Sequence, residues 1–391
     1  MVLINILLRS RVLTGMALLL ASYQAKALDP MYVKLSDSAR FTPTLQLSES
    51  YDDNIKGVDK GAKGSWITSI VPSFSLHAEG RKSAYMVTYR AISDVFHQSH
   101  KDNNTDHFLD AKLGMDFDRR NRLILNAGWQ DVEDTDVGEG QTQNDRYTLG
   151  RVGGNYTYGA KTARMQLVMG ANFETLRYQN SEDLNAEKER DSTNGRGTLF
   201  YRITPKTRVI GELRRSHFDY VSYSARTSNN TSGLVGLEWE ATARTSGTVK
   251  VGREWKEYTN ADVDTKSAQT WEAGINYEPT TYSTFHFTSR SALDEGDEGT
   301  ASAVKTRNYR VAWEHKWRER ISSEISYDWS TNDYQDYPRS DDRSTLGVGL
   351  TYKLRRWLDL SFRYRRLEND STMEEESYKR NIFTFSVTGS L

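Results

Sequence analysis

Residues 107–117 read HFLDAKLGMDF, and apolar side chains occupy every second position of this stretch. One side of the segment carries His107, Leu109, Ala111, Leu113, Met115 and Phe117, whereas the other side carries Asp110, Lys112 and Asp116. Successive side chains of a β-strand point to opposite faces of its sheet, so this period of two predicts a strand with one apolar and one polar face.

The same alternation recurs along the chain and predicts eighteen strands. The predicted strands cover residues 41–50, 66–78, 83–97, 106–117, 122–131, 145–157, 162–176, 192–203, 207–220, 231–241, 245–257, 267–278, 281–292, 303–315, 320–330, 343–353, 356–367 and 378–391. An even number of strands lets a chain of hairpins begin and end on the same side of a membrane, as bacterial outer-membrane barrels do.

The connections between these segments alternate in length. Those at 118–121 and 204–207 are tight, whereas those at 52–64 and 179–191 are long and polar. Short periplasmic turns alternating with longer extracellular loops are typical of an outer-membrane barrel. A soluble periplasmic β protein, the main alternative, gives no reason for this alternation.

Aromatic residues gather near both ends of the predicted strands. Tyr147, Trp255, Trp271, Tyr309 and Trp329 lie near the ends joined by long loops, and Phe117, Tyr201, Tyr282, Tyr352 and Trp357 lie near the ends joined by tight turns. Two such bands are expected where a barrel wall crosses the two interfaces of a membrane.

The composition agrees with a sheet that has one apolar face, and it argues against several other classes of protein. Of the 391 residues 37% are hydrophobic and 11% aromatic. The 52 basic and 53 acidic residues nearly balance, which argues against a nucleic-acid partner. Cysteine is absent, so disulfides and thiolate sites are excluded. The sequence contains no G-x-S-x-G or H-E-x-x-H pattern, so we expect no enzymatic activity, no metal site and no cofactor.

The first 27 residues read as a secretory signal peptide. Arg9 and Arg11 precede a short apolar run, and Ala25 and Ala27 form a small-x-small cleavage site. We therefore expect a signal peptide at 1–27, a periplasmic segment at 28–40, and an outer-membrane barrel at 41–391 of a Gram-negative bacterium.

A barrel of eighteen strands is wide enough to hold an aqueous lumen, so transport is the expected function. Parity along the strands predicts pore-lining side chains at Arg90, Asp94, Lys112, Arg164, Arg196, Arg202, Glu212, Arg214, Glu272, Arg290, Arg310, Glu314, Glu324, Asp328, Asp359, Arg363 and Arg365. Arginine is the commonest type in this set. The residues either form Arg-carboxylate ladders that keep the wall hydrated and rigid, or together bind a hydrated, acidic glycan through guanidinium forks.

The start of the expected barrel contains Phe41-Thr42-Pro43-Thr44-Leu45, Tyr51-Asp52-Asp53-Asn54 and, at residues 66–72, WITSIVP. In these stretches the chain resembles the β-barrel porin-2 family and related outer-membrane barrels of exopolysaccharide clusters. The resemblance implies an eighteen-stranded barrel that exports a polysaccharide together with a periplasmic polysaccharide export or co-polymerase protein. It brings no catalytic residue. The chain ends in Leu391, where such barrels usually end in Phe, so Phe383, Phe385 and Leu391 are the expected assembly signal.

Export of an exopolysaccharide for a biofilm, matrix or capsule-like layer is therefore the first functional hypothesis. The second is a general diffusion porin, which an inward-folded loop would favour. The third is a structural or adhesive surface barrel with a plugged lumen. We expect a monomeric barrel whose partners are outer-membrane lipid and lipopolysaccharide, the polysaccharide substrate and the barrel-assembly machinery.

Overall fold

The computed structural model describes residues 31–135, 144–160, 162–180, 183–240, 244–296 and 302–390. The strands within this part of the chain are β1 Val33–Lys34, β2 Ala39–Asp52, β3 Ser65–Glu79, β4 Ser83–Phe96, β5 Asn104–Asp116, β6 Asn121–Asp134, β7 Asp145–Tyr158, β8 Met165–Tyr178, β9 Arg190–Thr204, β10 Thr207–Tyr220, β11 Ser228–Trp239, β12 Thr245–Tyr258, β13 Lys266–Thr280, β14 Ser283–Asp294, β15 Ala303–Arg318, β16 Ile321–Gln335, β17 Ser340–Arg355, β18 Leu358–Ser371 and β19 Tyr378–Ser390. Four short 3-10 helices lie in the connections, at His100–Asp102, Asp183–Glu187, Ser224–Arg226 and Glu374–Glu376.

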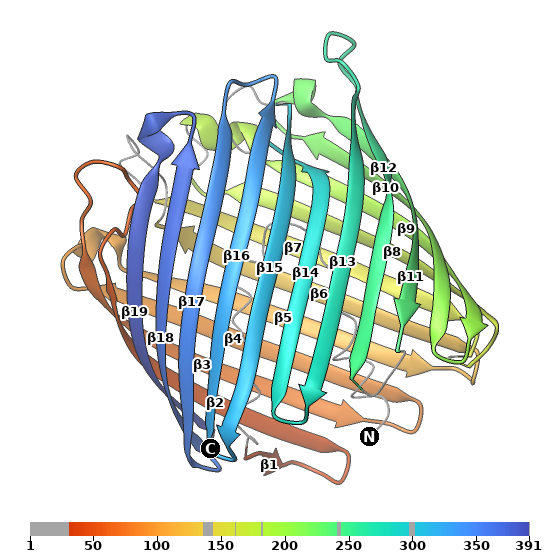
Figure 1. The fold of residues 1–391 in the computed structure, drawn as a ribbon, viewed down its shortest axis with the longest axis horizontal. Coiled ribbons are helices and arrows are strands. Elements are labelled where there is room, and N and C mark those ends of the chain that lie inside the picture. The colour runs from red at the N-terminus through yellow and green to blue at the C-terminus, as the bar shows by residue number, and fades with distance from the viewer. Residues whose placement is uncertain are drawn as a thin grey trace.

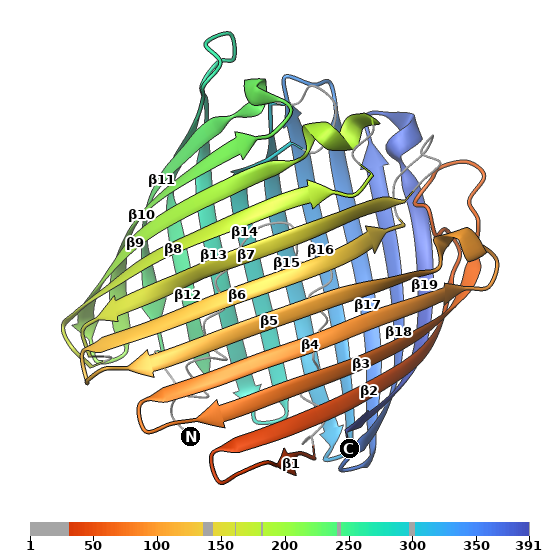
Figure 2. The same ribbon diagram turned by 180° about the vertical axis from the view of Figure 1, so that it is seen from behind.

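Strands β2 to β19 form one closed antiparallel barrel. Each strand pairs with its neighbours in the chain, and β19 pairs with β2 in a register that joins Phe383 to Tyr51. Figures 1 and 2 show the tilted strands of the two walls, with tight turns at the lower rim and longer connections at the upper rim. Closure removes the two free edge strands that an open sheet would have, as a strand-built membrane protein requires. The predicted eighteen-stranded barrel is confirmed.

Apolar side chains cover the outer face of the wall. On β10 the side chain of Leu213 is 71% exposed, whereas its neighbour Glu212, one residue away on the opposite face, is only 5% exposed. Val235 on β11 and Val251 on β12 continue the exposed apolar band across the next two strands. A soluble protein would bury such a band, so the outer face is suited to acyl chains.

The strands extend further toward the long-loop rim than the apolar pattern predicts. The expected loop at 331–342 shrinks to residues 336–339, because Asp333 of β16 still pairs with Ser340 of β17. The alternation of apolar residues ends where a strand leaves the lipid, but backbone pairing continues beyond that level. Sequence patterning therefore underestimates the length of these strands.

The residues Tyr51 to Asn54 fasten the seam that closes the barrel. Arg380 of β19 donates to both carboxylate oxygens of Asp52, with its Nη2 2.6 Å from Oδ2, and the backbone N–H of Asn381 donates to Asp53 at 2.7 Å. Asn54 donates to the carbonyl of Lys379 at 3.0 Å. The stretch therefore links the first and last strands of the barrel.

One of the expected interfacial aromatics points the other way. Tyr147 pairs with Val132 on β6 and Tyr178 on β8, and both partners alternate with the lipid-facing residues of their strands. Tyr147 therefore lies on the inner face, where its ring packs 5.7 Å from that of Tyr178. The other loop-side aromatics keep the outward direction, and Tyr309 stacks on Trp329 at 5.2 Å.

The segment expected to be periplasmic, residues 28–40, contributes β1, which pairs with Arg40 and Phe41 of β2. The expected signal peptide with Ala25 and Ala27, and the terminal Leu391, lie outside the described residues. No helix in the described ranges is long and apolar enough to cross a membrane.

Candidate functional site

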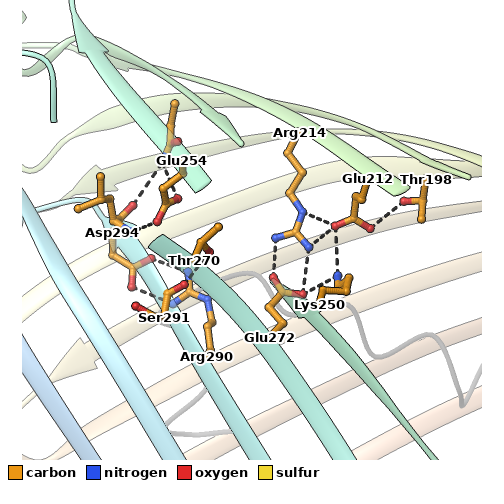
Figure 3. A network of polar contacts seen from close by, with 12 residues as sticks. Thr198, Glu212, Arg214, Lys250, Glu254, Thr270, Glu272, Arg290, Ser291 and Asp294 are labelled. Carbon is orange, nitrogen blue, oxygen red and sulfur yellow. Dashed lines mark hydrogen bonds and ion pairs between the residues drawn. The ribbon is translucent and has the colours of Figure 1, made fainter. Parts of the chain in front are cut away.

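The lumen wall over β9 to β13 carries a compact group of four charges, hereafter the four-charge cluster: Glu212, Arg214, Lys250 and Glu272. Glu212 and Arg214 lie on the same face of β10, while Lys250 and Glu272 are cross-strand partners on β12 and β13. Figure 3 shows the four side chains converging on one another. Strand periodicity and register thus bring together residues that are up to 60 positions apart in sequence.

Every charge of this cluster has an opposite partner. Arg214 forms an ion pair with Glu212 and donates to both oxygens of Glu272, at 2.5 and 3.0 Å. Lys250 lies 3.1 Å from Glu212 and 2.6 Å from Glu272. The hydroxyl of Thr198 donates to Glu212 at 2.8 Å. Two acids and two bases leave no formal net charge, so the cluster is a rigid polar surface without a strong field of either sign.

Beside this cluster the loop-side end of β14 separates from β13 and passes into the lumen, whereas β15 stays paired with β16 as far as Ala303. We call the described residues 291–296 of this segment the inward hairpin end. Thr270 of β13 donates to the carbonyl of Ser291 at 2.7 Å, and Glu254 of β12 accepts from the backbone N–H of Leu293 at 2.5 Å. Both side chains lie on the inner face, so the β14 backbone passes on the lumen side of β13.

Charged and hydroxyl groups hold the inward hairpin end in place. Arg290 pairs with Asp294 through two bonds of 2.6 and 2.9 Å. Glu295 forms an ion pair with Lys256, whose side chain is fully buried, and accepts from the Tyr220 hydroxyl at 2.8 Å. Contacts from β10, β12 and the hairpin itself therefore converge on one segment. Figure 3 places Arg290 and Asp294 of this group beside the four-charge cluster.

The wall opposite the four-charge cluster is rich in hydroxyl groups. In a ring of eighteen strands β3 is nine strands away from β12, and β3 with its neighbours forms what we call the hydroxyl wall. Its inner-face hydroxyls are Thr42, Thr44, Ser48, Ser50, Ser65, Ser69, Ser73, Ser75, Thr88, Thr384, Ser386 and Thr388. Some bond across strands, as Ser50 does to Thr384 at 2.9 Å and Ser75 to Thr88 at 3.0 Å. The lumen therefore has a charged wall on one side and a hydroxyl-rich wall on the other.

A further ladder lies on β15 and β16, where Arg310 contacts Glu324 at 3.1 Å and Asp328 at 2.5 Å. Glu314 of the same strand lies 3.5 Å from the imidazole of His286 on β14. The predicted candidates on these strands thus contact one another or a neighbouring polar side chain.

The remaining predicted pore residues are dispersed. Arg90 lies over the Phe108 ring at 4.6 Å, Arg196 donates to Asn155 at 3.0 Å, and Arg202 donates to the Pro205 carbonyl at the lower rim at 2.6 Å. The register places the following on the inner faces of β4, β5 and β18: Asp94, Lys112, Asp359, Arg363 and Arg365.

Arg164 differs from its prediction. It lies in the turn before β8, so the strand parity that assigned it to the lumen does not apply to it. Its guanidinium lies 5.3 Å from the ring of Tyr201, which faces outward.

Parity along β12 could have identified three functional residues that the candidate set lacks. Lys250, Glu254 and Lys256 alternate with Val249, Val251 and Trp255, which is the same signal that selected the other candidates. The inward turn of β14 has no such signal, because its sequence continues the alternation of a wall strand.

The family model for putative beta-barrel porin 2 matches residues 40–391. The chain belongs to this family. No curated protein matches it. Among solved structures, OccK2 (OpdF) and the outer-membrane protein OpdK, both from Pseudomonas aeruginosa, are similar, with TM-scores of 0.50 and 0.51 at 10% and 11% identity. Each comparison covers 90% of this chain, and 98% and 99% of the respective structures. OccAB4 from Acinetobacter baumannii is similar at a TM-score of 0.51 and 10% identity, over 91% of this chain and 99% of its own.

These three solved structures and this chain have the same barrel fold. Together with the family match, these likenesses identify the chain as a porin-like barrel of the Gram-negative outer membrane, and neither the family nor the neighbours are enzymes in general.

Proposed function

We propose that the barrel is a conduit for hydrated polar solutes, with small uncharged or weakly charged glycans as its first substrate class. The inward hairpin end is the observation that carries this proposal. It lies inside the lumen beside the four-charge cluster, so it narrows the path next to a dense group of charged side chains. A narrowed path selects by solute size and by polar contacts.

The chemistry of the two walls supports a glycan. Sugar hydroxyls both donate and accept hydrogen bonds, so they can exchange water for the Ser and Thr groups of the hydroxyl wall and for ion-paired side chains opposite. The guanidinium of Arg214 is already occupied by Glu212 and Glu272. A guanidinium that is already paired with two carboxylates binds a further acidic group weakly. This favours a neutral glycan over the acidic one that the arginine-rich sequence suggested.

Export of an exopolysaccharide is the second candidate function, and the hydroxyl wall favours it. A continuous surface of hydroxyls on β19, β2, β3 and β4 offers many weak, interchangeable contacts to a sliding polymer. On this model the inward hairpin end moves aside, and a periplasmic polysaccharide export or co-polymerase protein delivers the chain to the lower rim.

Liposome swelling with neutral oligosaccharides of increasing length separates the two candidates. A small-solute conduit admits mono- and disaccharides and excludes longer chains, with a sharp fall in rate at one length. A polymer conduit admits long chains at similar rates once the hairpin end is released by Lys256→Gln. Secretion of normal amounts of polymer by a deletion strain would contradict the export candidate.

Failure of all sugars to enter, in both proteins, would contradict both candidates. That result would favour the adhesive surface barrel.

A further inference from the structure

The outer face of the barrel has a cleft of about 460 Å³ near the upper rim, where the wall strands separate. The cleft is lined by Arg253, Ser267, Gln269, Trp271, Lys305 and Arg307, together with Ala268. The register between β13 and β14 ends at Trp271 and Ser291, where the inward hairpin end begins. The departure of β14 from the wall therefore creates the cleft between β13 and β15.

Three cations line this cleft on the lipid-facing side. Arg253, Lys305 and Arg307 occupy the same parity as the outward residues Val251 and Tyr309 of their strands. Arg307 lies 3.2 Å from Asp333, and Arg253 donates to the Ser267 hydroxyl at 3.0 Å. Among the described lining residues there are three cations and no carboxylate, and the neighbouring Asp333 forms an ion pair with Arg307.

Two outward arginines elsewhere near the upper rim each have a carboxylate of a neighbouring strand as partner. Arg146 lies 3.3 Å from Glu133, and Arg177 lies 2.8 Å from Asp191. The cleft differs from these two positions because it gathers three cations.

The depth of the cleft in the membrane follows from the aromatic band. Trp271 and Tyr309 belong to the loop-side aromatics, and Gln269 and Arg307 lie two residues closer to the upper rim on the same strands. Two residues of strand correspond to roughly 7 Å along the strand. Interfacial aromatics lie at the headgroup level, so Lys305 and Arg307 lie where the phosphates of outer-leaflet lipids are found. Arg253 lies two residues on the membrane side of Trp255, but it pairs in register with Gln269 and lines the same cleft.

We propose that this cleft binds the phosphorylated headgroup of an outer-leaflet glycolipid. Arg253 and Lys305 would contact phosphate oxygens, the polar groups of Ser267 and Gln269 would bond the sugar, and the Trp271 ring would pack against the first acyl carbons. Guanidinium and ammonium groups are the usual partners of phosphate. A lipid bound here would also cover the exposed end of β13.

Native mass spectrometry of the full-length barrel in detergent tests the proposal by titration with bis-phosphorylated lipid A. Each of Arg253→Gln and Lys305→Gln should weaken binding by about fivefold, since each cation contributes on the order of a fivefold gain near an anionic lipid surface. Arg146→Gln and Arg177→Gln are matched controls and should change binding little. Lys305→Arg keeps the charge and should restore binding.

Equal losses in the cleft variants and the rim controls would overturn the proposal, since binding would then follow total charge. Inorganic phosphate provides the other arm of the test. Displacement of the lipid by phosphate at comparable concentration would show an anion site without lipid selectivity, and would likewise overturn it. If a neutralised variant fails to fold, the wild-type protein still tests the proposal. Its affinity for lipid A without phosphates must then be lower than its affinity for bis-phosphorylated lipid A.

Discussion

Arg214 on β10 and Glu272 on β13 form a two-point ion pair across two intervening strands, with nitrogen-oxygen distances of 2.5 and 3.0 Å. Side chains of non-adjacent strands can meet only on the concave face of a curved wall. The pair therefore marks the inner face of the barrel and the most crowded part of its polar lining.

Loss of Arg214 should make the lumen prefer cations. In Arg214→Gln the cluster keeps Glu212, Glu272 and Lys250, a net charge of −1. A unit charge at about 4 Å in water contributes about 1 kcal/mol, so the ratio of cation to anion permeability should rise about fivefold. Reversal potentials in a KCl gradient measure this ratio. Arg215→Gln, one residue away on the outer face, should leave it unchanged, and an equal shift in both variants would refute the assigned faces.

Release of the inward hairpin end should enlarge the path. Lys256→Gln leaves Glu295 buried without its ion-pair partner, a loss of roughly 3–5 kcal/mol for the docked arrangement. The hairpin end should then spend more time out of its docked position in the lumen, so single-channel conductance should rise. Glu257→Gln, on the outer face of the same strand, serves as the control. Unchanged conductance in Lys256→Gln would mean that the hairpin end does not limit flow.

The seam between β19 and β2 should be a major source of stability. Arg380→Gln removes the partner of Asp52, whose side chain is almost fully buried, and should lower the free energy of unfolding by roughly 3–5 kcal/mol. Arg146→Gln breaks the more exposed pair with Glu133 and should cost less than about 1 kcal/mol. Urea unfolding in lipid vesicles measures both. Similar losses in the two variants would argue against a special role for the seam.

The apolar outer band predicts a strong effect of charge at Leu213. Leu213→Arg places a cation on the lipid face and should destabilise the folded barrel by roughly 2–4 kcal/mol if the site lies near the bilayer midplane. Leu213→Phe should be tolerated. Equal stability of the two variants would mean that this face does not contact hydrocarbon.

Acid should loosen the upper rim through Asp336. Hydrogen bonds from Lys266 and Ser302 hold the pKa of this carboxyl below its usual range. A depressed pKa stabilises the fold above the unfolded pKa, and the contribution is lost as pH falls through the folded pKa. Asp336 has a φ of 62°, which Asn also tolerates, so Asp336→Asn should keep the turn and remove this part of the acid sensitivity. An unchanged pH profile of unfolding would contradict the assignment.

The alternation of apolar and polar residues was sufficient to predict the barrel, but it was not sufficient to predict how side chains pair inside the lumen. Alternation such as that of residues 107–117 specifies which face meets lipid, because side chains of opposite parity meet different solvents. The pairing of Arg214 with Glu272 depends on strand register and wall curvature, which parity leaves open. The inward turn of β14 arises from contacts such as that of Glu254 with the backbone of Leu293. These residues are 39 positions apart, and a local sequence pattern cannot predict such a contact.

Planar-bilayer recording of the purified, folded barrel tests the conduit most directly. Wild-type protein should insert and give discrete, ohmic conductance steps that partially close when small neutral glycans are added, with larger steps in Lys256→Gln. Absence of any conductance in both proteins, while each migrates as a folded barrel on unheated gels, would contradict an open aqueous path through the molecule.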